Sequence, residues 1–238
     1  MINNREIKLI NSLKRKKNRI EEGLFVVEGE KNVEELLHSN FQTLSIYATN
    51  EWINKVEHIK VSVKELDRIS SLSTPNRVLA LVKIPKQKPI NTSITSLVID
   101  GVNDPGNLGT IIRTANWFGI NQVICSNNSV DKFNPKTIMA SMGSIFKTDV
   151  FYTDLKNYLE ESKLPIYGAL LEGHPIYDTL FNDPSILLLG SESHGISIDL
   201  IPSITYKTTI PGSGSTESLN LGVSTAIYCS EYFKQNSI

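Results

Sequence analysis

The stretch "SLVIDGVNDPGNLGTIIRTANWFGINQVICS" (residues 96–126) contains an apolar run, a helical pattern and a second apolar run. Residues 96–100 and 122–126 are nearly continuous in apolar side chains, as expected for strands that are buried on both faces. The residues between them repeat at helical spacing, with Asn107 as the expected N-cap and Gly119 as the stop. The apolar stripe of this helix is Leu108, Ile111, Ile112, Ala115 and Phe118. Such a strand–helix–strand order predicts a parallel sheet.

The same alternation continues to the end of the chain. Further strands are expected at 165–171, 185–190 and 206–210. Further helices are expected at about 135–142, 154–162 and 218–233, the last with apolar positions Leu219, Val223, Ala226, Ile227 and Phe233. The second half therefore predicts an α/β fold with a mostly parallel sheet covered on both faces. Ligands of such sheets bind beyond the carboxyl ends of the strands.

The first half has its own pattern. The segment "REIKLINSLKRKKNRIEEG" (5–23) predicts one basic amphipathic helix with apolar positions Ile7, Ile10, Leu13 and Ile20. Strands are expected at 24–30, 43–49 and 77–84, and helices at 31–40 and 63–72. The prolines and lysines of "PKQKP" (85–89) indicate a linker. We therefore place a small α/β domain at residues 1–85, a linker at 86–91 and a second domain at 92–238.

Composition and charge narrow the class of protein. The 238 residues are 40% hydrophobic and 21% charged, as in ordinary soluble globular proteins. Residues 1–90 carry 16 Lys and Arg against 11 Asp and Glu (net +5), whereas residues 91–238 carry 8 against 14 (net −6). This asymmetry predicts that the basic first half of the chain binds a polyanion and that the acidic second half has a different role. Lys14, Arg15, Lys16, Lys17 and Arg19 form a candidate phosphate-binding patch, the alternative being a solvated basic helix.

Cysteine usage and apolar runs favour a cytoplasmic protein. Cys125 and Cys229 lie in apolar patterns without a cysteine partner or a histidine at metal-ligand spacing, so we expect reduced, buried thiols and no metal site. No apolar run approaches the ~20 residues that span a membrane. The N-terminus is too polar for a signal peptide.

Three loops carry candidate chemistry. Arg113 lies opposite the apolar stripe of its helix, which favours either a solvated side chain or an arginine directed at an anion. In "LLLGSESHGIS" (187–197), Glu192 follows Gly190 in a tight turn closed by Gly195, and the alternative is an exposed glycine-rich turn. The lone His194 in that turn is not expected to act in catalysis.

The third loop, "PGSGSTESLNLG" (211–222), precedes the last helix and suits either a helix cap or a phosphate cradle. The sequence lacks the motifs of P-loop nucleotidases, dinucleotide-binding enzymes, zinc proteases of the HExxH type and serine hydrolases. The residues alone predict an α/β ligand-binding domain that is preceded by a basic domain in the same chain.

Three segments, in this order, resemble the motifs of the SpoU (TrmH-like) family of RNA ribose 2′-O-methyltransferases in the SPOUT superfamily. They are "NLGTIIRTA", "LLLGSESHGIS" and "IPGSGSTESLNLGVSTAIY", within residues 95–235. The first half resembles the RNA-binding domain, similar to a ribosomal-protein fold, that many SpoU enzymes carry first. The resemblance implies a trefoil knot, a homodimer with an active site completed across the interface, and bound S-adenosylmethionine.

The resemblance also assigns residues. It implies functional roles for Asn107, Arg113, Glu192, Ser218 and Asn220. It implies cofactor contacts, largely through the backbone, at Leu170, Gly190, Ile210 and Leu219. Arg113 would activate or orient the 2′-hydroxyl, and Glu192 would fix its loop or pair with Arg113. The family usually has Met where this chain has Gly212, which bears on packing around the cofactor.

The implied substrate is RNA, with large-subunit ribosomal RNA favoured because of the added front domain. A transfer RNA 2′-O-methyltransferase is the alternative within the class. A catalytically silent RNA-binding protein of the same fold is the alternative outside it, and a small-molecule enzyme would leave the basic half unexplained.

Overall fold

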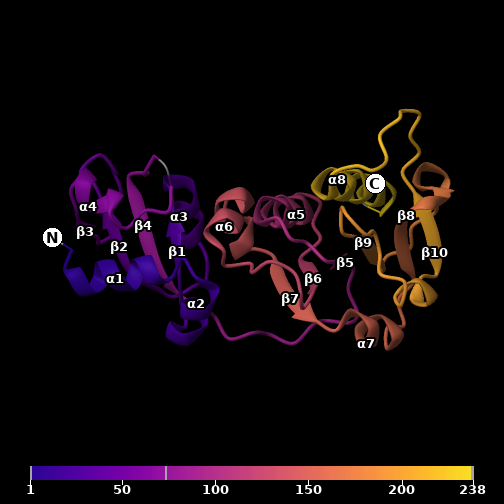
Figure 1. The fold of residues 1–238 in the computed structure, drawn as a ribbon, viewed down its shortest axis with the longest axis horizontal. Helices are drawn as coiled ribbons and strands as arrows, with labels where there is room; N and C mark the ends of the chain where they lie inside the picture. The colour runs from indigo at the N-terminus through magenta and orange to yellow at the C-terminus, as the bar shows by residue number, and fades with distance from the viewer. Residues whose placement is uncertain (1, 73, 237–238) are drawn as a thin grey trace.

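The computed structural model describes residues 2–72 and 74–236, which form two sheets side by side along the molecule (Figure 1). The first has four strands in the order β1-β4-β2-β3 and the second has six in the order β10-β8-β9-β5-β6-β7. We call the parts built on them the four-stranded unit and the six-stranded unit. The chain between them, residues 84–95, contains no helix or strand, and the domain boundaries inside it stay a prediction.

The four-stranded unit mixes antiparallel and parallel pairs. Strand β4 pairs antiparallel with β1 and β2, while the short β3 adds to β2 in parallel. Its strands are β1 (Leu24–Glu28), β2 (Thr43–Ala48), β3 (Ile59–Lys60) and β4 (Val78–Lys83). Its helices are α1 (Asn4–Ser12), α2 (Lys16–Glu22), α3 (Glu30–Leu37) and α4 (Val63–Asp67).

Every pairing in the second sheet is parallel, as the alternation of apolar runs and helices predicts. Its strands are β5 (Ser96–Asp100), β6 (Gln122–Ser126), β7 (Asp149–Thr153), β8 (Ile166–Pro175), β9 (Ile186–Gly190) and β10 (Tyr206–Thr209). Its helices are α5 (Pro105–Trp117), α6 (Pro135–Ser141), α7 (Leu155–Glu160) and α8 (Leu221–Asn236), with 3-10 turns η1 (Ser144–Phe146), η2 (Ile176–Asp178) and η3 (Ile201–Ser203).

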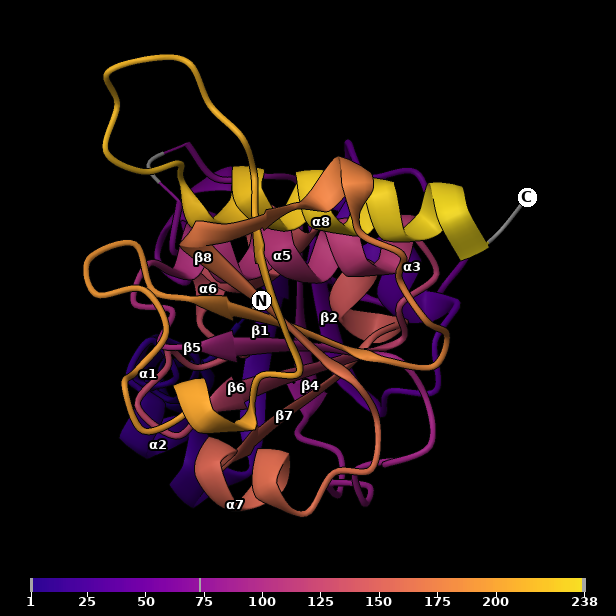
Figure 2. The same cartoon turned by 90° about the vertical axis from the view of Figure 1, so that its right-hand side faces the viewer.

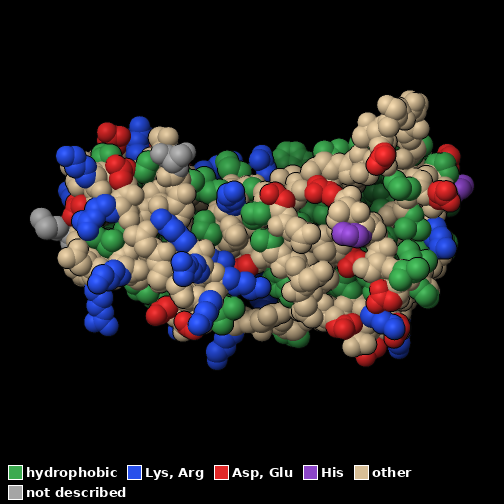
Figure 3. Space-filling model, in the orientation of Figure 1, with side chains coloured by type: hydrophobic (Ala, Val, Ile, Leu, Met, Phe, Trp, Pro, Cys, Tyr) green, Lys and Arg blue, Asp and Glu red, His purple; other side chains and the backbone are tan. Residues whose placement is uncertain are grey.

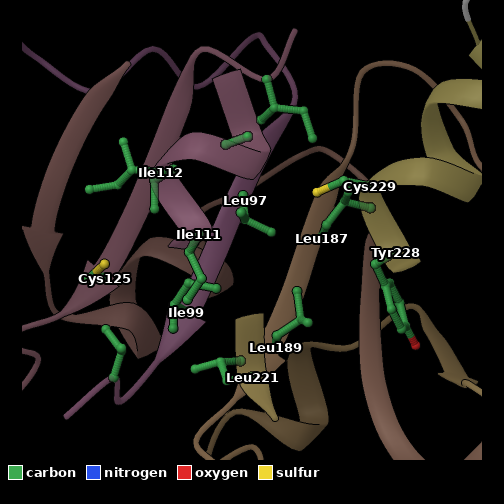
Figure 4. Packing of buried hydrophobic residues seen from close by; sticks show 14 of the residues in the cluster. Leu97, Ile99, Ile111, Ile112, Cys125, Leu187, Leu189, Leu221, Tyr228 and Cys229 are labelled. Atoms are coloured by element: carbon green, nitrogen blue, oxygen red, sulfur yellow. The ribbon is translucent and has the colours of Figure 1, made fainter. Parts of the chain in front are cut away.

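Successive side chains of the central strands pack into the cores on opposite faces of the sheet, because side chains alternate across a strand. Leu97 and Ile99 pack under α5 and α8, whereas Val98 joins the core on the α7 side. Figure 2 shows α5 and α8 over one face of the sheet and α7 below the other. The first of these cores, with Leu187 and Leu189 beside α8, is seen in Figure 4. Both faces are covered, which confirms the expected α/β architecture.

Burial also fixes the state of the thiols. Cys125 and Cys229 are buried and free, as predicted. Burial raises the pKa of each thiol to about 12. Among the residues that the structure describes, no helix is long and apolar enough to cross a membrane.

The single basic helix expected over 5–23 is wrong, because the chain turns between α1 and α2. Arg15 has extended backbone angles, and α2 begins after it. The carbonyl groups left open by the turn accept side-chain donors instead of helical amides. Asn18 donates to the Ser12 carbonyl (2.8 Å), and Arg19 donates to the carbonyls of Leu13 (2.7 Å) and Lys14 (3.1 Å). Ile20, expected to be apolar and buried, is exposed.

The predicted start and buried face of the last helix are also wrong. Helix α8 begins at Leu221 rather than at 218, and Asn220 caps it by accepting from Gly222 N (2.9 Å). Leu219, Val223 and Phe233 are exposed. The residues of α8 that are buried are Leu221, Gly222, Thr225, Tyr228, Cys229, Glu231 and Tyr232. The sequence pattern did not show strand β7 because its five residues begin with the exposed Asp149.

Candidate active site

The first part of the site is the start of α5, where the sequence places the wrong cap. Asp104, not Asn107, is the N-cap: its Oδ1 accepts from Asn107 N (2.9 Å), and Pro105 takes the first helical position. Asn107 is therefore inside the first turn, and its side chain points out of the helix. Its amide Nδ2 donates to Glu192 Oε1 (2.7 Å) across 85 residues of sequence. The capping aspartate fixes the backbone that presents this amide.

Glu192 lies in the tight turn that the sequence predicts after β9. Ser191 and Gly195 exchange two backbone hydrogen bonds (2.9 and 3.0 Å), and Gly195 has a φ of +66°, which favours glycine. A Cβ at Gly190 would meet the carbonyl carbon of Gly195 at 1.9 Å, so only glycine fits beneath the turn. Asp100 at the end of β5 accepts from Ser197 N (2.7 Å) and ties the far side of the turn to the sheet.

Asn220 joins the third segment to the other two. Its Nδ2 donates to Glu192 Oε1 (2.7 Å) and to Asn107 Oδ1 (3.2 Å), while its Oδ1 caps α8. Leu221 N also donates to Glu192 Oε1 (3.2 Å). One carboxylate oxygen thus accepts three N–H groups from the starts of two helices. Because α5, the turn after β9 and α8 converge here, the network links the three sequence segments in one place.

A small hollow lies beside this network, between the loop after β5 and the turn after β9. It is lined by Gly101, Asn103, Asn107, Ser191, Glu192 and Leu221. Its walls come from the carboxyl ends of neighbouring strands, where parallel sheets bind ligands.

Arg113 is exposed, and its side chain makes no hydrogen bond or ion pair within residues 2–72 and 74–236. The pairing with Glu192 is therefore not formed, and Glu192 instead fixes its loop. Ser218 is also exposed, and within the same ranges its side chain makes no hydrogen bond. Of the five predicted functional residues, the structure brings Asn107, Glu192 and Asn220 into contact and leaves Arg113 and Ser218 at the surface.

Of the four predicted cofactor positions, Gly190 and Ile210 lie at or just beyond the carboxyl ends of their strands, Leu170 lies within β8 two residues past its last pairing with β9, and Leu219 lies in the loop before α8. Leu170, Gly190 and Ile210 are half-buried. Leu219 is 45% exposed. Strand β8 lies between β10 and β9, so the three strand ends meet at one edge of the sheet.

The loop from 211 to 220 stands clear of the molecule, as Figure 2 shows, and each of its residues is exposed. A Cβ at Gly212 would meet no other atom within 4 Å. The position at which the family usually has Met is thus open space here. Glycine in place of Met at position 212 therefore removes an apolar side chain from the loop without creating a clash.

Four of the five residues of the predicted phosphate-binding patch are exposed, and their contact with RNA stays a prediction. Lys14, Arg15, Lys16 and Lys17 are exposed at the turn between α1 and α2 and on α2. The prediction that Arg19 belongs to this patch is wrong. Arg19 is 2% exposed and forms an ion pair with Asp131 of the six-stranded unit (2.6 Å). Its guanidinium faces the other half of the protein and is not available to a phosphate.

Sequence reasoning missed Asp100 and Asp104, which position the site without lining it. Each carried a signal, since Asp100 ends an apolar strand and Asp104 precedes Pro105 at the start of a helix. His194 is exposed and contacts Ser193 Oγ (2.7 Å). In the described part of the chain, no three His, Cys, Asp or Glu side chains gather in a way that could hold a metal ion.

A parallel sheet with a polar network at the carboxyl ends of its strands, preceded by a basic unit, is typical of an α/β protein that binds a ligand at that edge. The sequence matches the SpoU rRNA Methylase family over residues 95–230 and the MRM3-like substrate binding domain over residues 4–80. The chain therefore belongs to the SpoU rRNA methylase family, and the expected family is confirmed.

Similar proteins match over nearly the whole chain. The chain is 32% identical to the 23S rRNA (guanosine(2553)-2'-O)-methyltransferase RlmP of Bacillus subtilis, over 94% of each sequence. The structure of a putative RNA methyltransferase of the TrmH family from Porphyromonas gingivalis is 35% identical, with a TM-score of 0.87 over 99% of this chain and 100% of that one. An AdoMet-bound rRNA methyltransferase from Sinorhizobium meliloti is 27% identical, with a TM-score of 0.87 over 99% and 97%.

Proposed function

We propose that the protein transfers a methyl group from S-adenosylmethionine to a ribose 2′-hydroxyl of large-subunit ribosomal RNA. The observation that carries this proposal is the network of Asn107, Glu192 and Asn220. It joins all three family segments at one edge of the parallel sheet, and the helix that carries Asn107, α5, also carries the exposed Arg113. A silent RNA-binding protein would have no need to keep this arrangement.

The residues present fit the cofactor. S-adenosylmethionine supplies an electrophilic methyl group when it is bound. Gly190, Ile210 and Leu219 would hold it through their backbone, with Leu170 as an apolar contact. Gly190 can carry no side chain, so the end of β9 keeps bare backbone at this edge. The loop 211–220, which joins β10 to α8, would contribute Leu219 to this contact.

Arg113 is the residue proposed to act on the substrate. A guanidinium stays protonated at physiological pH and is therefore better suited to stabilising a developing alkoxide, or to holding the adjacent phosphate, than to removing a proton. Its side chain has no partner within residues 2–72 and 74–236, so an RNA phosphate or ribose oxygen would not have to displace one. Asn107 and Asn220 would orient the ribose beside it, and Ser218 would contact the substrate or cofactor from the loop.

Arg113→Ala should lower kcat for methyl transfer by about 100-fold or more, because removal of an electrostatic interaction at a developing oxyanion costs roughly 2.7–4 kcal/mol. The affinity for S-adenosylmethionine, measured by calorimetry, should stay within about twofold. Arg113→Lys is the matched variant that keeps the charge but loses the planar fork. Equal loss of cofactor binding and transfer in a folded Arg113→Ala protein would contradict this role.

Ribosomal RNA is proposed as substrate because the first unit matches a substrate-binding domain and because relatives are 23S rRNA methyltransferases. The test is transfer of labelled methyl to RNA that lacks the native modification, followed by mapping of the position that resists alkaline cleavage. One large-subunit site would support the proposal. Labelling of transfer RNA alone would replace the substrate, and no labelling of any RNA would refute the activity.

A homodimer in the cytoplasm is the proposed working form. Helix α8 is apolar on both sides: its outer stripe of Val223, Ile227 and Phe233 is exposed or half-buried, and Trp117 at the end of α5 is 82% exposed. The rings of Phe118 and Phe233 lie 5.7 Å apart and join the two helices into one apolar surface. A second copy of the chain would bury this surface.

Sedimentation equilibrium should give twice the chain mass, and Val223→Glu should give the monomer. The implied trefoil knot stays a prediction.

A further inference from the structure

Arg19 differs from the basic residues around it because its side chain crosses to the other half of the molecule. Nε and Nη2 donate to Asp131 Oδ2 (2.9 and 2.6 Å), and Nη1 donates to the carbonyls of Leu13 and Lys14. The residue is 2% exposed, and its guanidinium uses four of its five N–H donors. It therefore binds the turn between α1 and α2 on one side and the six-stranded unit on the other.

Asp131 is held in place for this contact. Its second oxygen, Oδ1, accepts from Phe133 N (3.2 Å), and Phe133 stacks on Phe25 of β1 with ring centroids 4.3 Å apart. The ion pair thus closes the edge of an apolar interface between the two units. Lys147 and Glu35 form a second, more exposed ion pair across the same boundary (2.7 Å).

Rigid elements connect this contact to the active site. Asp131 precedes α6, and α6 packs so closely on α5 that a Cβ at Gly109 would lie 2.5 Å from the Ala140 Cβ. Gly109 is two residues from Asn107 on the same helix. In the four-stranded unit, Arg19 donates to the carbonyl groups of Leu13 and Lys14, and Lys14 is itself a member of the basic patch. Figure 3 shows Lys and Arg side chains gathered over the four-stranded unit and its junction with the rest.

We propose that Arg19 is a positioning residue for RNA: its bond to Asp131 holds Lys14, Arg15 and Lys16 at a fixed distance and orientation from the catalytic network. This inference rests on the proposed function. Because the two units keep one relative orientation, RNA phosphates bound at the turn would place the target ribose at the catalytic network. Correct placement of this kind contributes to the rate as directly as a catalytic contact does.

The test uses the full chain with Arg19→Met, Asp131→Asn and the double variant. The single Arg19→Met leaves the half-buried Asp131 carboxylate without its cation and is destabilising, whereas the double variant removes both charges together. Lys147→Met is the matched control, because it removes one charge from the same boundary without touching the turn. Arg19→Lys keeps the charge but cannot reach Asp131 and two carbonyls at once.

The double variant should fold with a Tm near that of the wild type and bind S-adenosylmethionine within twofold. Its kcat/KM for RNA should fall at least 10-fold, mainly through KM, while Lys147→Met stays within twofold and Arg19→Lys lies between. A double variant within twofold of the wild type would overturn the proposal. A general loss of stability, in contrast, would lower cofactor binding and RNA methylation together.

A second readout needs no methyl transfer and so separates this inference from the proposed function. Hydrogen exchange of the amides from Leu13 to Arg19 should become at least 10-fold faster in Asp131→Asn, with α5 unchanged. RNA affinity in a filter-binding assay should fall in the same variant. Unchanged exchange at the turn would refute the positioning role even if the wild type methylates RNA. Faster exchange with weaker RNA binding would support it even if the reaction were a different one.

Discussion

At the scale of single residues, Glu192 shows how the site depends on one acceptor atom. Its Oε1 receives the amides of Asn107 and Asn220 and the backbone N–H of Leu221. Each of these groups would be left with a donor to satisfy if the carboxylate were absent. Glu192 therefore sets the orientation of both asparagines and the start of α8, although its own side chain is exposed.

Glu192→Ala should lower methyl transfer at least 10-fold, because Asn107 and Asn220 lose the atom that orients them. Glu192→Gln is the matched variant: its oxygen can still accept, so we expect a smaller loss. Steady-state kinetics with the RNA substrate would measure both variants. If Glu192→Ala and Glu192→Gln fell equally, the negative charge rather than the acceptor geometry would be responsible.

Buried thiols and buried phenols, Tyr228 among them, give the fold a dependence on alkaline pH. Burial raises the pKa of Cys125 and Cys229 to about 12 from an ordinary 9.0, and raises that of Tyr228 to about 12 from 10.0 against a weaker opposing hydrogen bond from Thr208. Above pH 9 the unfolded chain loses these protons while the folded chain keeps them. Stability is therefore full below pH 9 and declines as the pH rises toward 12.

Urea unfolding at pH 7.5, 9 and 10.5 should show a falling free energy of unfolding above pH 9. Each group can contribute a slope of up to about 1.4 kcal/mol per pH unit. The double variant Cys125→Ala and Cys229→Ala should have a shallower slope over the same range. An identical slope in that variant would assign the effect to other groups.

At the scale of elements, the packing of α5 determines where its functional side chains lie. Gly109 faces α6, and a Cβ there would lie 2.6 Å from the Thr137 carbonyl oxygen. Asn107 and Arg113 are on the parts of α5 that remain accessible. The glycine lets two helices approach closely enough to hold both residues on a fixed support.

Gly109→Ala should destabilise the protein by about 1–3 kcal/mol, because overpacking outweighs the ~1 kcal/mol that alanine gains in helix propensity. Gly109→Ser should be worse, since it adds a larger side chain to the same contact. Thermal or urea unfolding would measure both. A more stable Gly109→Ala variant would mean that α5 and α6 can separate without cost.

At the scale of the whole molecule, charge divides the chain into a basic front and an acidic back. The exposed members of the predicted patch are Lys14, Arg15, Lys16 and Lys17, of which Lys17 also pairs with Glu21 at 3.7 Å. Lys14 donates to the Ser70 carbonyl (2.8 Å).

Replacing Lys14, Arg15 and Lys16 together with Gln should weaken RNA binding and make it less dependent on salt. The slope of log K against log salt should fall by about 0.7–0.9 for each phosphate that the variant no longer neutralises. Affinity for S-adenosylmethionine should not change, because the residues proposed to bind it, Leu170, Gly190, Ile210 and Leu219, belong to the other unit. Unchanged RNA affinity and salt slope would remove this patch from the RNA interface.

The sequence by itself determined the parallel α/β half, the tight turn of Glu192 and the burial of both cysteines. These features follow from local periodicity, glycines and apolar runs, which act within a few residues. Only the tertiary structure decided which face of α8 is buried, because that helix is apolar on both sides and its neighbours select one. It also decided that Asn107 and Asn220 meet across 113 residues and that Arg19 pairs with Asp131 across 112. Such contacts depend on how the chain returns to the same place, and no local pattern encodes that return.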